Sequence, residues 1–309
     1  MRRFIIDTDT ASDDAVALIM ALREESIRVE AITVVAGNMG IDLAVKNALI
    51  SVAQANTYAA PVYRGLSKPI LRDLFTAEFA HGSDGMGEMN LPEPSLAEED
   101  GNAVDAIIDL IMKNPKEIEL VTLGPLTNIA VAYLKEPRIA QNVKNVTIMG
   151  TGGLGQGNIT PAAEFNIYVD AEAASIVFQS GMPITVVGWD ASMGTAFIHQ
   201  EDIDYLLSQN SSIANFCVRC NETHKKWTYE TSGKIGFDIA DATTMAVAIH
   251  PEIGTEYINV YAYVETKSEV MYGHVMMDVL NVSRKPANIR LCKSLDGKKY
   301  KDYLFKQII

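Results

Sequence analysis

The chain has 309 residues, of which 48% are hydrophobic and 21% charged, a composition typical of globular proteins with a large core. Its net charge of -13 repels phosphate backbones, so we do not expect nucleic acid as a partner. No apolar run approaches the roughly 20 residues of a membrane helix, and the basic start gives way to aspartates too soon for a signal peptide. We therefore expect no membrane partner and a cytoplasmic location.

Apolar segments in the first two thirds of the chain alternate between short and long runs. The short runs predict strands, and the longer, periodic runs predict helices. Strands are expected at residues 3–6, 29–35, 118–123, 143–149 and 184–187, and helices at 13–22, 41–55, 103–112, 126–134 and 171–179. Strand–helix alternation with continuously apolar strands is typical of a parallel sheet covered on both faces.

The last third of the chain has a different pattern. Helices are predicted at residues 202–207, 211–226 and 241–249, and antiparallel strands at 259–264 and 269–278, before a short closing helix. No repeat, linker or break in composition divides the sequence. We predict a single α/β domain over residues 1–309, with an open, mostly parallel central sheet, helices on both faces and a small antiparallel extension.

Four aspartates lie within eight positions, at the end of the first predicted strand and the start of the next helix: Asp7, Asp9, Asp13 and Asp14. Asp13 and Asp14 could simply complement the helix dipole, by about 0.3–1 kcal/mol each, but Asp7 and Asp9 could not. Four like charges this close repel unless a cation or protons neutralise them. An all-oxygen set suits Ca²⁺ or Mg²⁺ and not zinc, so the cluster predicts a metal-dependent catalytic site.

Polar residues also follow other predicted strands. Ligands of open parallel sheets bind outside the carboxyl ends of the strands, so these residues are expected to gather at the same edge as the aspartates. They are Asn38, Thr127, Asn128, Asn158, Glu164 and Asn166.

The segment from Asp7 to Asp14 resembles the DxDxxxDD signature of the nucleoside hydrolases, the inosine–uridine-preferring nucleosidases and their relatives. The resemblance continues, in the same order, at residues 37–38, 81–87, 123–128, 157–170 and 241–242. It implies hydrolysis of the N-glycosidic bond of ribonucleosides to ribose and free base. It also implies Ca²⁺ as cofactor, a small-molecule nucleoside as partner and a homodimer or homotetramer.

The resemblance assigns roles to residues by position. Asp9 would be the general base that deprotonates the attacking water. The glycosidic bond would break through an oxocarbenium-like transition state. The Ca²⁺ ligands would be the side chains of Asp9, Asp14 and Asp241 and the carbonyl of Leu123, with Asp7 supporting the loop from behind. The residues that bind the ribose would be Asp13, Asn38, Asn158, Glu164, Asn166 and Asp241. Ribosides should therefore be preferred over 2′-deoxyribosides.

The sequence departs from the well-studied branch of this family at one position. That branch has a histidine before the late aspartate, where it protonates the leaving base, and this sequence has Ala240. His81, Trp227 and Tyr229 are the candidate residues at the base, although the two aromatic residues could equally pack a surface helix. An aromatic stack can raise the basicity of a purine, so we favour purine nucleosides. We interpret His224 as structural.

Two other functions are compatible with parts of the sequence. Residues 7–10 also fit the DxDx(T/V) start of a haloacid-dehalogenase-like phosphatase, but Ala11 occupies the fifth position. Such an enzyme would also need a lysine in a loop after a strand, whereas Lys144 lies at the start of a predicted strand. A non-catalytic nucleoside- or calcium-binding protein is the other alternative, and Ala240 favours it.

Overall fold

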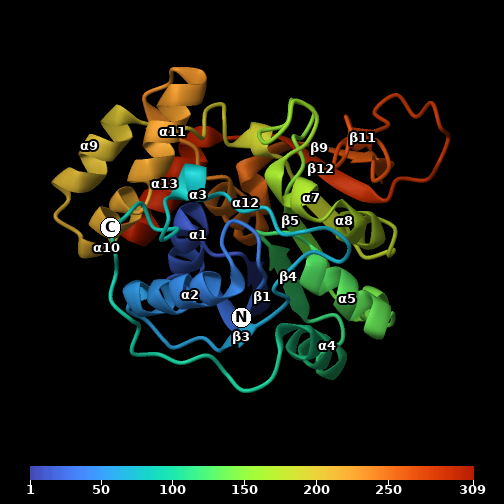
Figure 1. Ribbon diagram of the computed structural model, residues 1–309, viewed down its shortest axis with the longest axis horizontal. Coiled ribbons are helices and arrows are strands. Elements are labelled where there is room, and N and C mark those ends of the chain that lie inside the picture. Colours follow the sequence, from blue (N-terminus) through green and yellow to red (C-terminus); the bar gives the residue numbers. More distant parts are fainter.

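An eight-stranded sheet forms the centre of the protein in the computed structural model, which describes residues 1–309 (Figure 1). Every neighbouring pair in it is parallel except the last, β12 with β9. In spatial order the strands are β3 (Val62–Arg64), β2 (Ile27–Val34), β1 (Arg2–Thr8), β4 (Ile118–Thr122), β5 (Asn145–Met149), β6 (Ile184–Val187), β12 (Ile289–Leu295) and β9 (Gly254–Val260). The predicted α/β fold with a mostly parallel sheet is confirmed.

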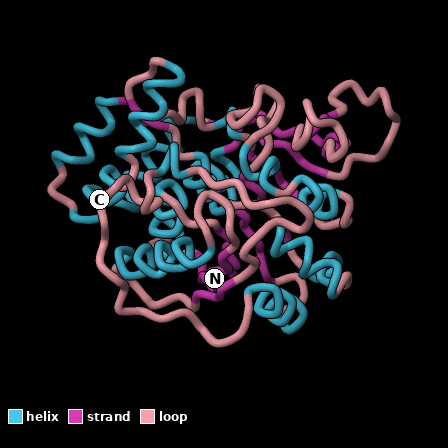
Figure 2. The backbone as a smooth tube through the Cα atoms, viewed as in Figure 1, coloured by secondary structure: helices cyan, strands magenta, loops and turns pink.

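Helices cover both faces of the sheet, as Figure 2 shows by colour. One group, whose members contact one another, contains α1 (Ser12–Leu22), α2 (Ile41–Ala55), α12 (Ala240–Ile249) and α13 (Gly297–Ile308). A second group contains α4 (Ala103–Lys113), α5 (Thr127–Lys135) and α8 (Ala171–Phe178). Alternate side chains of β1 reach the two separate cores, Phe4 and Ile6 in one and Ile5 in the other. A strand buried on both faces is apolar at every position, which is why these strands were predictable.

The remaining elements are short or lie outside the sheet. Two further strand pairs are antiparallel, β10 (Ala262–Val264) with β11 (Val275–Met277) and β7 (Ile198–His199) with β8 (Gly236–Phe237). The first pair is the predicted small extension. The other helices are α3 (Glu78–His81), α6 (Ile139–Asn142), α7 (Phe165–Val169), α9 (Gln200–Ser208), α10 (Ser212–Arg219) and α11 (Glu222–Ser232), with 3₁₀ turns at Trp189–Ala191 and Pro251–Ile253. None of the helices has both the length and the apolar character needed to cross a bilayer.

Some of the predictions for individual elements differ from the structure. The strand expected at residues 269–278 is confined to β11, because Gly273 adopts a φ of 78° that only a turn accommodates. The helix expected at 211–226 is two helices, α10 and α11. At the break, the side-chain amide of Asn221 donates to the carbonyl of Cys217 (2.9 Å) and so replaces a lost helical hydrogen bond. The strands β3 and β12 were not predicted.

Candidate functional site

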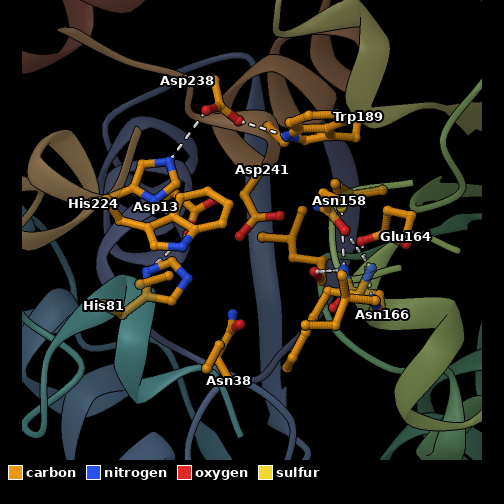
Figure 3. A pocket seen from close by; sticks show the side chains of 18 of the residues that line it. Asp13, Asn38, His81, Asn158, Glu164, Asn166, Trp189, His224, Asp238 and Asp241 are labelled. Carbon is orange, nitrogen blue, oxygen red and sulfur yellow. Dashed lines mark hydrogen bonds and ion pairs between the residues drawn. The ribbon is translucent and has the colours of Figure 1, made fainter. Parts of the chain in front are cut away.

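A cavity of about 570 Å³ opens at the carboxyl ends of the central strands (Figure 3). Segments distant in sequence meet around it, including the first turns of α1 and α12, the loop after β2, the ends of β4 and β5, and α11. The predicted site residues that line the cavity are Asp13, Asn38, His81, Leu123, Asn158, Glu164, Asn166, Trp227 and Asp241. The sequence therefore identified most of its polar wall.

Asp9 lies just beyond β1 and is completely buried. Its Oδ2 accepts a hydrogen bond from the backbone N–H of Asn38 (2.5 Å), whereas its Oδ1 has no partner in the protein. Two glycines leave room for this carboxylate: a Cβ at Gly37 would stand 2.2 Å from Oδ2, and one at Gly124 would stand 2.6 Å from Oδ1. Burial, followed by the charge of Asp14, raises the pKa of Asp9 well above its usual value.

Three further carboxylates form an acidic cluster that could hold a metal ion. One oxygen from each of Asp13, Asp14 and Asp241 lies within 4.8 Å of the others. Burial raises the pKa of all three, that of Asp13 to about 7, because each charge is removed from water beside like charges. Asp14 also accepts from Thr8 Oγ1 and from the backbone N–H of Ala11 (2.9 Å), and so caps α1.

The donor chemistry of this region fits a hard cation. The buried Oδ1 atoms of Asp9 and Asp13 both lack a hydrogen-bond partner, which is costly for carboxylates unless a ligand supplies one. Only oxygen donors are present in the cluster. The acidic cluster contains Asp13, whereas the set of ligands predicted from the sequence contains Asp9 in its place. The charge of Asp14 raises the pKa of both Asp9 and Asp13.

The wall opposite Asp13 is built at the start of α7. Glu164 accepts from the backbone N–H groups of Asn166 (2.9 Å), Ile167 (3.3 Å) and Thr151 (3.0 Å) and so caps this helix. Burial raises the pKa of Glu164 to about 7. The Asn166 amide donates to the Leu123 carbonyl (2.7 Å), which holds that carbonyl at the cavity.

Asp7 lies outside the cavity, behind Asp9. Its Oδ2 accepts from Thr33 Oγ1 (2.6 Å) and from the side-chain amide of Asn128 (2.9 Å), and burial raises its pKa to about 7. The same amide donates to the carbonyl of Val34 (3.1 Å). Asp7 and Asn128 therefore tie β1 to β2 and to the start of α5, which fixes the strand end that carries Asp9.

The remaining wall of the cavity is aromatic. The ring of His224 stacks against that of His81, with centroids 5.5 Å apart and planes 3° apart, and against that of Trp227 at 5.5 Å and 24°. Trp227 in turn contacts Phe79 at 6.0 Å, and Trp189 also lines the cavity. Such a wall offers flat apolar faces to a planar ligand.

Four residues of this wall were absent from the predicted site: Phe79, Trp189, His224 and Asp238. Trp189 follows β6, so the rule that ligands bind beyond strand ends would have found it. His224 lies three residues before Trp227 on α11, which places the two side chains on one face of the helix.

Of the residues predicted to bind the substrate, Tyr229 is the one that does not line the cavity. It is 59% exposed and does not line the cavity, although it lies on the same helix as Trp227. Residues two positions apart in a helix point to different sides, so only one of the two can face the ligand.

Comparisons with known proteins agree with this geometry. A family model described as "Inosine-uridine preferring nucleoside hydrolase" matches residues 4–302. The chain belongs to this family. The nucleoside hydrolase is 34% identical over 310 residues to the pyrimidine-specific ribonucleoside hydrolase RihA of Salmonella schwarzengrund, covering 98% of this chain and 97% of the relative. It is 35% identical over 303 residues to RihB of Escherichia coli, also named pyrimidine-specific, covering 96% and 93%.

Among solved structures, the nucleoside hydrolase is similar to a purine-preferring ribonucleoside hydrolase from Gardnerella vaginalis. The TM-score is 0.92 at 28% identity, over 99% of this chain and 98% of the other. The predicted family and the predicted enzyme class, a ribonucleoside hydrolase, are thus confirmed. The full-length match also removes the phosphatase alternative. The named relatives include both pyrimidine and purine enzymes.

Proposed function

We propose that this nucleoside hydrolase cleaves ribonucleosides, with purine nucleosides favoured, using Ca²⁺ and Asp9 as general base. The observation that carries the proposal is the buried Asp9 carboxylate, whose free Oδ1 lies beside an acidic cluster. A group that is deprived of water and left without a partner is suited to take a proton from a bound water molecule.

The side chains of Asp9, Asp14 and Asp241 and the carbonyl of Leu123 would hold the cation. Their oxygen donors and their mutual repulsion support this set. When bound, Ca²⁺ supplies orientation and modest activation of the attacking water and neutralises the gathered negative charge.

The ribose would lie between the two polar walls of the cavity. Asp13, Asn38, Asn166 and Asp241 would bind its 2′- and 3′-hydroxyls, and Asn158 and Glu164 would bind its 5′-hydroxyl, since all six line the cavity. The aspartates also oppose the positive charge that develops on the ribose as the bond to the base breaks.

The base would lie against the aromatic wall. Trp227, Phe79 and Trp189 present extended rings, and a two-ring purine covers more of such a surface than a one-ring pyrimidine. This is the support for favouring purine nucleosides. The homodimeric or homotetrameric assembly stays a prediction, which light scattering would test.

Hydrolysis of inosine, adenosine, uridine and cytidine, with and without a calcium chelator, tests the proposal. The expected result is release of ribose that the chelator suppresses, with kcat/KM higher for the two purine nucleosides. Asp9→Ala, assayed at saturating Ca²⁺, should lose about 10²–10⁴-fold in kcat and still bind inosine. Wild-type protein that binds but does not hydrolyse would instead support the alternative of a non-catalytic binding protein.

A further inference from the structure

A buried histidine–carboxylate pair borders the cavity on the aromatic side. His224 is 7% exposed and Asp238 is 3% exposed, and the His224 Nε2 donates to Asp238 Oδ1 (3.2 Å). Asp238 also accepts at Oδ2 from Trp189 Nε1 (2.8 Å) and from Ser192 Oγ (3.4 Å). These contacts fix both the carboxylate and the plane of the imidazole, as Figure 3 shows from the cavity side.

The second nitrogen of His224 has no partner. Its Nδ1 is buried and makes no hydrogen bond within the protein, although the residue lines the cavity. A buried polar nitrogen left without a hydrogen-bond partner costs about 1–3 kcal/mol. A polar group of a ligand in the cavity would remove this cost.

His81 differs from His224 in both respects. Its Nδ1 is hydrogen-bonded to Ser12 Oγ (2.7 Å). Burial, and then the nearby charge of His224, lowers the pKa of His81 to about 3, so this ring stays neutral. It can donate a hydrogen bond to a base but has no spare proton to give up.

The pKa of His224 is shifted in the opposite direction to that of His81. Burial alone lowers its pKa, but the hydrogen bond and charge of Asp238, together with the charge of Asp13, raise it above its ordinary value. The carboxylate of Asp238 correspondingly has a lowered pKa, as expected for an ion pair. The groups facing the imidazole are Asp238 before α12, Asp13 on α1 and His81 on α3.

We propose that His224 protonates the departing base and that Asp238 positions it for this step. The inference rests on the proposed function. His224 would supply the proton that a histidine supplies in the well-studied branch of the family, where this chain has Ala240. In the reaction, the water oxygen bonds to C1′ while the C1′–N bond breaks and its electron pair stays on the base. Asp9 takes the proton of the water, and His224 gives its Nδ1 proton to the base. Asp9 then releases its proton to solvent, and His224 regains one from solvent.

Two substrates separate this role from a structural one. The base of inosine needs protonation to leave, whereas 4-nitrophenyl β-D-ribofuranoside releases a phenolate that leaves without it. For His224→Gln we expect kcat on inosine to fall about 10²–10⁴-fold, with the nitrophenyl riboside within about threefold of wild type. Tyr229→Phe, an exposed change on the same helix, is the control and should leave both rates unchanged.

A pH profile provides a measurement that does not depend on the His224 variant folding. In wild-type protein, kcat/KM for inosine should fall at high pH as His224 loses its proton, and the nitrophenyl riboside should lack this limb. In Asp238→Asn the limb should move to lower pH, because the carboxylate that raises the His224 pKa is gone.

Equal losses on both substrates in His224→Gln, or a limb shared by both substrates, would overturn this inference and leave the proposed function intact. Wild-type protein that hydrolyses neither substrate would overturn the proposed function itself, and with it the role of His224.

Discussion

Gly37→Ala is the substitution that tests the catalytic geometry most directly. A Cβ at this position would stand 2.2 Å from Asp9 Oδ2 and 2.6 Å from Pro125 Cδ, where ordinary contact begins at 3.4 Å. The proline ring blocks one side, and Asp9 is held by the Asn38 N–H at 2.5 Å. The carboxylate must therefore move by roughly 1 Å, a misplacement that costs on the order of 10²-fold in rate.

The assay is steady-state hydrolysis of inosine, with circular dichroism and a thermal melt to show that the variant is folded. We expect kcat/KM to fall about 100-fold. Gly124→Ala should act similarly, because its Cβ would stand 2.6 Å from the other oxygen of Asp9. Gly40→Ala is the matched control in the same loop as Gly37, since nothing lies within 4 Å of its Cβ. Folded Gly37→Ala protein with a rate within about threefold of wild type would refute the reasoning.

Three further predictions concern the cation, the sugar and the base. Calcium at 100 times its Kd should stabilise the fold by about 2.7 kcal/mol and raise Tm, and an unchanged melt would count against the cation site. A 2′-deoxyribonucleoside should show kcat/KM at least about 10²-fold lower than the corresponding ribonucleoside, because the missing 2′-hydroxyl leaves buried polar groups of the protein unpaired. Equal rates would contradict the ribose contacts. Trp227→Ala should weaken inosine turnover by about 1–3 kcal/mol of lost stacking, and Tyr229→Ala should leave it unchanged; the reverse order would place the base elsewhere.

The sheet was largely predictable because its strands are buried on both faces. Strand β6 and helix α2 have the predicted bounds, since each is a continuous or periodic apolar run between clear breaks. Strand β12 was not predicted, because the exposed residues Arg290 and Lys293 interrupt its run of apolar residues. Strand β3 has only three residues, too few for any periodicity to show.

The acidic part of the site was predictable for a local reason, and the pair of His224 and Asp238 was not. Asp7, Asp9 and Asp14 are close in sequence, so their repulsion is evident before any fold is known. His224 and Asp238 are brought together only by the packing of α11 against the segment before α12. Nothing near either residue in the sequence indicates its partner.

The position of β12 has a consequence for how the molecule is made. This strand comes from the last part of the chain, yet it lies between β6 and β9 and hydrogen-bonds to both. While a ribosome is still synthesising residues 289–295, the edge of β6 has unsatisfied backbone groups on the side that β12 will cover. The sheet can thus be completed only after nearly the whole polypeptide has been synthesised, and C-terminal truncation should yield aggregation-prone protein rather than a smaller working enzyme.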